Sequence, residues 1–165
     1  MFKIIKYIFP IIYTSLLAYD SNSVVEKKVN AYIYEHKEED LNKYLFEQKA
    51  KDNPAAYFQH GYLYISGAKP KNAGLANFYF LKAIEHSKHN VDIKRMAQKA
   101  MADSLYSGDG CQQSLKLAHD YYLASAKLKY PPAMFNVAIT FKELGHSRQY
   151  KMWKSKYKRL KKSPF

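Results

Sequence analysis

GYLYISG at residues 61–67 and ADSLYSG at residues 102–108 decide the fold that we expect of this chain. Both stretches begin with a small residue, place a large apolar residue three positions later, and close on glycine after three more. A third copy begins at Ala138 with AITF, although Leu144 stands where its closing glycine would be. The starting positions 61, 102 and 138 lie 41 and 36 residues apart, a period that is typical of helical solenoids.

A second pattern of small and aromatic residues follows each of the first two copies. It consists of Ala76, Phe80 and Ala83, and again of Ala118, Tyr122 and Ser125. A short helix pair cannot bury its apolar face alone, so it stacks on its neighbours. A small residue on the first helix lets the second approach closely, a large aromatic residue fills the adjoining space, and a closing glycine supplies a positive-φ helix end.

The expected fold is therefore all-α, with about four antiparallel helix pairs. We expect the pairs at 24–36 with 40–51, 54–66 with 73–88, 91–107 with 114–129, and 132–144 with 147–162. Turn signals separate them at Asp52-Asn53-Pro54, at His89-Asn90 and at Tyr130-Pro131-Pro132. Alternation of apolar and polar residues over five or more positions is absent after residue 18, so no strand is predicted.

With these residues in view, the chain resembles the Sel1-like repeat family, which is related to the tetratricopeptide repeats. The matching stretches are 56–67 with 76–83, LYSGDGC at 105–111 with LAHDYYLASA at 117–126, and PAMFNVAITF at 132–141. The resemblance implies a right-handed α-solenoid with a concave binding face. It also implies an adaptor function, in which the protein binds other proteins. Similar exported bacterial proteins take part in host interaction, envelope signalling or neutralisation of a toxin.

The domain organisation expected from the sequence has four parts. Residues 1–18 read as a signal peptide, 19–53 as an N-terminal helical cap, 54–157 as Sel1-like repeats and 158–165 as a basic C-terminal tail.

The signal peptide is indicated by Lys3 and Lys6, by the apolar run at 7–18 and by Ala18 as the last removed residue. The alternative is a membrane anchor, but twelve residues interrupted by Pro10 are too few for a bilayer, which needs about 20. A cleaved signal predicts a periplasmic or secreted protein.

The chain is strongly basic, with a formal net charge of +13 that falls to +11 once residues 1–18 and their two lysines are removed. Such a charge favours acidic partners of any kind: an acidic protein face, an anionic membrane or nucleic acid. A single cysteine, Cys111, excludes an intramolecular disulfide. The 16 tyrosines supply amphipathic side chains for a partner surface.

The candidate partner-binding residues lie on the first helix of each repeat, at the positions that the repeat pattern directs towards the concave face. They are Phe58, Tyr62 and Ile65, then Lys99, Asp103 and Tyr106, then Phe135, Ile139 and Lys142. The alternative is that the apolar members belong to the core, since a slip of one residue in helix register would move them there. If exposed together, they form an aromatic and charged strip of the kind that recognises proteins.

The segment 148–162 carries eight basic residues and no acidic one, interleaved with Tyr150, Trp153 and Tyr157. Such a segment suggests binding to nucleic acid or to anionic lipid. The alternative, which we favour, is that Trp153 and Tyr157 dock on the last repeat while the lysines face water. An export signal removes most access to nucleic acid, so we expect no nucleic-acid partner and at most a weak contact with anionic membranes.

Catalytic and metal-binding patterns are weak. His86 and His89 have helical spacing for a metal, but no third ligand lies nearby in the sequence. Ser66 and Lys69 fit the Ser-x-x-Lys pattern of a serine acylase, and some cysteine-rich members of the family have been described as β-lactamases. Ser155 and Lys158 fit it by chance, however, and no Lys-Thr-Gly partner exists. We therefore predict no enzyme, no metal and no cofactor.

Three functions remain in order of preference. The first is a monomeric exported module that binds one protein partner, for example as an immunity protein against a toxin. The second is a peripheral envelope protein that binds anionic lipid through residues 148–162. The third is a hydrolase that uses Ser66.

Overall fold

The computed structural model describes residues 18–162, and within this range the protein consists of helices and contains no strand. The helices are α2 (Asn22–Tyr34), α3 (Glu38–Lys49), α4 (Pro54–Ser66), α5 (Ala73–His86), α6 (Val91–Ser107), α7 (Leu115–Lys127), α8 (Pro131–Glu143) and α9 (Ser147–Lys162). The all-α class is thereby confirmed. The first pair begins two residues earlier than the sequence suggested, at 22 and 38.

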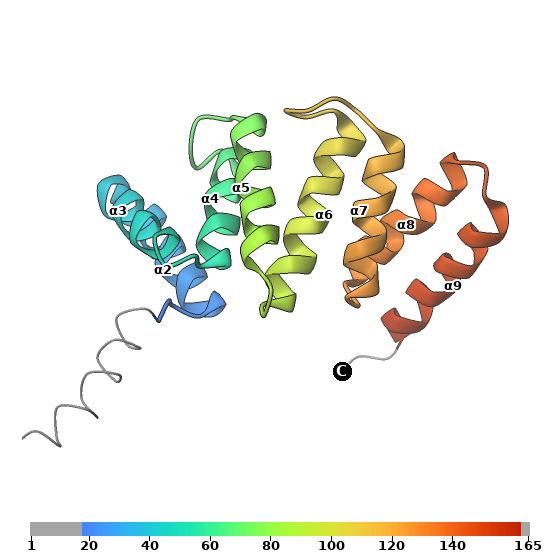
Figure 1. Cartoon of the computed structure of the whole chain (residues 1–165), viewed down its shortest axis with the longest axis horizontal. Helices are drawn as coiled ribbons and strands as arrows, with labels where there is room; N and C mark the ends of the chain where they lie inside the picture. The colour runs from blue at the N-terminus through green and yellow to red at the C-terminus, as the bar shows by residue number, and fades with distance from the viewer. Residues whose placement is uncertain (1–17, 163–165) are drawn as a thin grey trace, which may run out of the picture.

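From α4 to α9 the helices stand in a row in chain order and successive helices run in opposite directions, while α2 and α3 both lie beside α4 at the N-terminal end of the row (Figure 1). The closest packing is within the pairs α4–α5, α6–α7 and α8–α9, and α5–α6 and α7–α8 join one pair to the next. Among the helices of residues 18–162, none is long and apolar enough to cross a membrane.

Side-chain caps fix the start of four helices. Asn53, Asn72, Asn90 and Ser114 each accept a hydrogen bond from a backbone amide in the first turn, at 3.0, 2.9, 3.2 and 3.3 Å. Such caps satisfy donors that a helix start leaves unpaired. Pro54 and Pro131 occupy first-turn positions, where no amide donor is needed. The turn signals in the sequence therefore mark true helix boundaries.

Gly61 sets the distance between α4 and α5. A Cβ atom placed on it would lie 2.8 Å from the Phe80 ring and 3.0 Å from the Ala76 carbonyl oxygen. The equivalent small residues of the later copies, Ala102 and Ala138, are also buried. Close helix approach at the first residue of the repeat pattern is thus confirmed.

The ends of the first helices also follow the repeat pattern. Gly67 and Gly108 close α4 and α6 at φ angles of +87° and +84°, a region that glycine enters without strain. In the third copy the positive φ angle falls one residue later than the pattern, at Gly145 with +79°. The last pair therefore has the same kind of ending despite Leu144.

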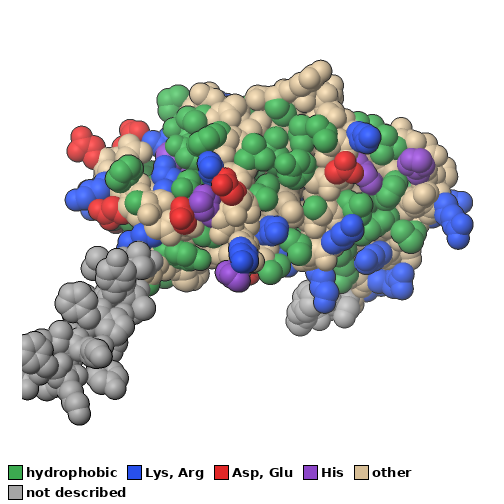
Figure 2. Space-filling model, in the orientation of Figure 1, with side chains coloured by type: hydrophobic (Ala, Val, Ile, Leu, Met, Phe, Trp, Pro, Cys, Tyr) green, Lys and Arg blue, Asp and Glu red, His purple; other side chains and the backbone are tan. Residues whose placement is uncertain are grey.

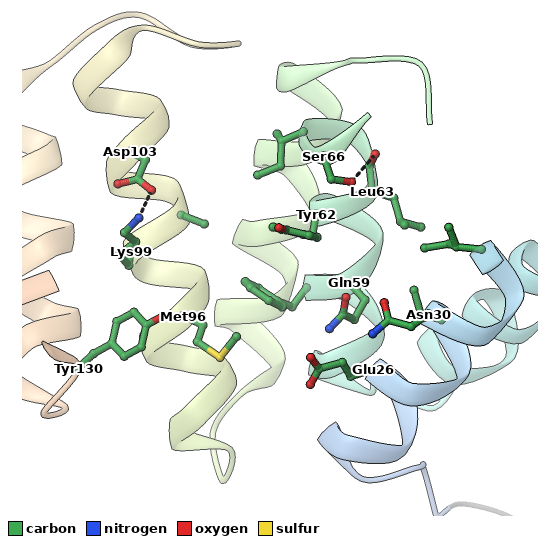
Figure 3. Close-up of a pocket in the computed structure, with 15 residues that line it drawn as sticks. Glu26, Asn30, Gln59, Tyr62, Leu63, Ser66, Met96, Lys99, Asp103 and Tyr130 are labelled. Atoms are coloured by element: carbon green, nitrogen blue, oxygen red, sulfur yellow. Dashed lines mark hydrogen bonds and ion pairs between the residues drawn. The ribbon is translucent and has the colours of Figure 1, made fainter. Parts of the chain in front are cut away.

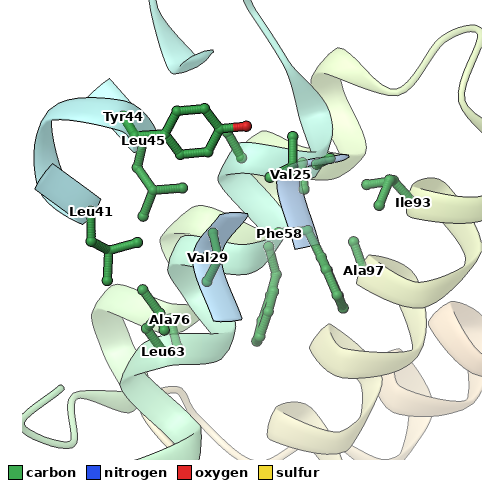
Figure 4. Packing of buried hydrophobic residues seen from close by; sticks show 14 residues of the cluster. Val25, Val29, Leu41, Tyr44, Leu45, Phe58, Leu63, Ala76, Ile93 and Ala97 are labelled. Atoms are coloured by element: carbon green, nitrogen blue, oxygen red, sulfur yellow. The ribbon is translucent and has the colours of Figure 1, made fainter. Parts of the chain in front are cut away.

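Two clusters of buried hydrophobic residues form the core, and they meet within α6. The first runs from Val25 on α2 to Ala97 on α6 and includes Phe58 and Phe80 (Figure 4). The second runs from Met101 on α6 to Trp153 on α9. The N-terminal helical pair contributes Val25 and Leu45 directly to the first cluster, so it shares its core with the repeats.

Two of the expected segments lie at the edges of the described range. The expected signal peptide spans residues 1–18, and all of it except Ala18 lies outside the described residues. At the other end, α9 continues without a break to Lys162, so the first five residues assigned to the basic tail are helical.

Candidate functional site

A groove of about 530 Å³ runs across the first helices of three pairs (Figure 3). We call it the α2–α4–α6 groove. Its walls come from α2, with Glu26 and Asn30, and from α6, with Met96, Lys99 and Asp103; its floor comes from α4, with Gln59, Tyr62, Leu63 and Ser66. Tyr130, between α7 and α8, closes one corner.

The groove brings together five of the nine residues that the sequence predicted. Tyr62 and Ile65 are 50% and 41% exposed, and Lys99 and Asp103 lie on the facing helix. Phe58 also lines the groove, but only 8% of it is exposed. The predicted outward orientation of Phe58 is wrong, because its ring packs against the ring of Phe80 in the first core cluster, with the two centroids 5.7 Å apart.

Asp103 is the polar anchor of the α6 wall. Its Oδ2 accepts a hydrogen bond from the Lys99 ammonium at 2.6 Å, and its Oδ1 accepts one from the Tyr122 hydroxyl of α7 at 2.7 Å. Burial and the bond to Asp103 raise the pKa of Tyr122 well above its usual range, so this hydroxyl remains a donor. Asp103 is therefore held in one position by two helices.

The other four predicted residues do not line the α2–α4–α6 groove. The rings of Phe135 and Tyr157 pack together with their centroids 5.4 Å apart. Both residues line a neighbouring hollow, together with Lys99 and Lys161. Tyr106 donates a hydrogen bond of 2.6 Å to Glu143 at the far end of α8. Ile139 is half-buried and Lys142 is exposed. Of these four residues only Phe135 lines the neighbouring hollow, which shares Lys99 with the groove, so the predicted strip is not one continuous surface.

The contribution of α2 to this surface was not predicted from the sequence. Glu26, Asn30 and Ile33 line the groove, although the first pair carries no glycine pattern. Their spacing of three and four residues marks a single helix face and was the available signal. Glu26, Lys99 and Asp103 give the groove a net charge of −1 in a chain of +13. The basic character of the protein therefore lies elsewhere.

A partly buried cluster of Lys49, His60, Tyr64 and Tyr79 forms a second concentration of titratable groups. The Lys49 amine lies 2.7 Å from His60 Nδ1 and 4.7 Å from the centre of the Tyr79 ring. Burial, aided by Lys69, lowers the pKa of Lys49 to about 8, and burial with the two lysines lowers that of His60 to about 4. His60 is therefore neutral near pH 7, and its Nδ1 accepts a hydrogen bond from the Lys49 ammonium group.

The weak catalytic and metal patterns gain no support from the geometry. The Ser66 hydroxyl bonds the Leu63 carbonyl at 3.4 Å, while the Lys69 amine bonds Asn42 at 2.8 Å and Glu38 at 3.4 Å. No hydrogen bond joins Ser66 to Lys69. His86 pairs with Asp52 at 3.3 Å, and residues 18–162 contain no cluster of three potential metal ligands.

The basic helix α9 is docked through its aromatic face. Trp153 is 7% exposed and belongs to the second core cluster, with Tyr150, Tyr157 and Leu160 packed against it. Lys154, Lys156 and Lys161 lie over aromatic rings of their own helix. The predicted docking of Trp153 and Tyr157 on the last repeat is confirmed, and the lysines of α9 are exposed.

No protein-family model matches this chain, and no curated protein sequence matches it at a significant level.

Proposed function

We propose that this protein is a non-enzymatic binding module whose α2–α4–α6 groove holds a segment of a protein partner. The observation that carries the proposal is the half-exposed apolar pair Tyr62 and Ile65 beside the fixed Asp103–Lys99 ion pair. Apolar anchors next to a positioned charge pair are typical of protein recognition sites. The partner segment is expected to be amphipathic and not strongly acidic, because the groove itself carries a net charge of −1.

The finer fold that we propose is a right-handed solenoid of the Sel1-like type. Its support is the 41- and 36-residue spacing of Gly61, Ala102 and Ala138, together with the close approach of Gly61 to Phe80. With residues 1–18 acting as a cleaved signal, the module would work as a monomer in the periplasm or outside the cell. Neutralisation of a toxin is one role that needs only such a signal and one binding surface.

The test is affinity capture with a matched pair of variants. Protein beginning at Tyr19 is used as bait against envelope and culture fractions, beside Ile65→Asp and Phe46→Asp. Phe46 is 72% exposed on α3 and does not line the groove. A stoichiometric protein recovered by the unmodified bait and by Phe46→Asp, but lost with Ile65→Asp, supports the proposal. Equal recovery by all three baits contradicts it.

A further inference from the structure

A separate open hollow, of about 620 Å³, lies where α7 ends, α8 begins and α9 makes its last turns. We call it the cationic hollow. Its apolar lining consists of Ala126, Met134 and Leu160, the first two of which are almost completely buried members of the second core cluster. None of its lining residues belongs to the α2–α4–α6 groove.

Four cations surround this apolar floor: Lys127 and Lys129 at the end of α7, and Lys156 and Arg159 on α9. Their side chains form no ion pair with any of the described residues 18–162. Four like charges around one hollow repel one another, so an anion placed there would be stabilised by all four.

The surrounding sequence offers no internal anion. Residues 121–165 contain eleven lysines and arginines and one acidic residue, Glu143, which gives +10 of the total +13. Glu143 ends α8, whereas the α8 residue that lines the hollow is Met134, nine residues earlier and about 14 Å away along the helix. Its carboxylate is bonded to Tyr106. Figure 2 shows the Lys and Arg side chains gathered over the end of the molecule that α9 forms.

We propose that the cationic hollow binds an anionic phospholipid at a membrane surface. The headgroup phosphate would lie between Lys127, Lys129, Lys156 and Arg159, and the first methylene groups of an acyl chain would cover Met134 and Leu160. Cationic side chains around an apolar floor match both parts of such a ligand. This proposal does not rest on the groove-binding function.

Two observations favour a lipid surface over a nucleic acid or an acidic peptide. Binding of single-stranded nucleic acid uses free aromatic faces for base stacking, but Trp153 is buried and Tyr157 packs on Phe135. The cations also extend beyond the hollow, because the exposed Arg148 and Lys162 lie on the same face of α9 as Arg159, eleven residues before it and three after it. A planar anionic surface can meet the edge of the hollow at Arg159 and this face of α9 at once.

The test is co-sedimentation with vesicles of phosphatidylcholine alone or with a third of phosphatidylglycerol. We expect binding only to the anionic vesicles. Each lysine near such a surface contributes about fivefold in affinity, so Lys127→Gln with Lys129→Gln should weaken binding roughly 30-fold. The matched control, Lys27→Gln with Lys43→Gln, removes the same charge from exposed positions on α2 and α3 and should change binding less than twofold.

The remaining outcomes separate the proposal from its alternatives. Equal losses in both double variants would mean that net charge alone drives binding, and would overturn the site. Binding to poly-glutamate or single-stranded RNA without binding to anionic vesicles would overturn the choice of ligand. Ile65→Asp tests the other surface: vesicle binding that survives this change is expected if the cationic hollow acts independently of the groove.

Discussion

The first half of the molecule, α2 to α6, and the second half, α6 to α9, attach their terminal helices by different interactions. In the first half, polar side chains join the terminal segment to distant residues. Asn22 and Asn90 exchange two amide hydrogen bonds of 3.0 and 2.6 Å, and Gln48 and Asn53 bind the backbone of Asp20 at 2.9 Å each. In the second half, no side-chain hydrogen bond of α9 reaches another described helix, and Trp153 docks the helix by apolar contact.

The two halves of the chain also differ in their balance of basic and acidic residues. Residues 1–120 contain sixteen lysines and arginines and thirteen acidic residues, whereas residues 121–165 contain eleven and one. In the first half many cations have carboxylate partners; in the second, apolar docking leaves the cations unpaired within the described chain. The same helix-pair unit therefore supplies a nearly neutral groove at one end and a cationic surface at the other.

The largest effect on stability is expected when the packing of α9 against the rest of the protein is removed. Trp153→Ala removes the one α9 side chain that is buried among the described residues, and should destabilise the protein by about 3–5 kcal/mol or release the helix. Urea unfolding followed by circular dichroism measures the change. Met152→Ala, at a neighbouring position that is 55% exposed, is the control and should cost less than about 0.5 kcal/mol. Similar costs for both variants would show that α9 is not held by this ring.

His60 gives the first half a pH dependence. Its pKa is about 4 in the folded protein against an ordinary 6.5, so below pH 6.5 the unfolded state binds more protons. Stability should therefore fall by about 3 kcal/mol as the pH drops from 6.5 to 4, and be unaffected by this group above 6.5.

His60→Gln keeps an acceptor for Lys49 and should remove most of that difference when urea midpoints are compared between pH 4 and 7. A smaller dependence of stability on pH should remain, because burial also lowers the pKa of His119. The exposed His89→Gln is the control and should retain the full slope. An unchanged slope in His60→Gln would mean that His60 is not the group responsible.

Helix approach in the first repeat can be tested at Gly61. Gly61→Val should destabilise the protein by about 2–3 kcal/mol, because the added carbons would overlap Phe80 and the Ala76 carbonyl. Gly74→Ala is the control: the nearest atom to its Cβ would lie 3.7 Å away, so it should be neutral or stabilise the helix by up to about 1 kcal/mol. Thermal unfolding of the two variants decides the point, and a tolerated valine would refute close packing there.

The smallest effect is expected at Asp103, where the two halves meet. Asp103→Ala leaves the largely buried Tyr122 hydroxyl without its acceptor and should cost about 1–2 kcal/mol. Asp103→Asn keeps an oxygen acceptor and loses only a partly exposed ion pair with Lys99, worth less than about 1 kcal/mol. Urea midpoints that fall equally in both variants would assign the stabilisation to the ion pair and not to Tyr122.

Most of the fold could be predicted from the sequence because its signals are local. Asn53, Asn90 and Pro131 mark helix starts through capping chemistry that depends on neighbouring backbone, and Gly61 with Phe80 reports a contact made in each repeat. The positive φ angle at Gly145 escaped notice because it falls one residue outside the pattern.

The candidate sites were predictable only in part, because grooves depend on how pairs are placed relative to one another. The repeat pattern located Tyr62, Ile65, Lys99 and Asp103, but could not tell that Phe58 turns into the core. Lys127 and Lys129 drew no attention in the sequence, since only the packing of both α7 and α9 against α8 brings these lysines and Arg159 around one hollow.

The docking residue of α9 is also the only tryptophan in the chain. Its indole is shielded from water when the helix is in place and would become hydrated when the helix leaves, so the intrinsic fluorescence of the protein reports one specific event without any label. A red shift of the emission on adding vesicles or a partner would therefore mean that the last helix has been displaced, and a constant emission maximum would mean that the ligand has bound to a preformed surface.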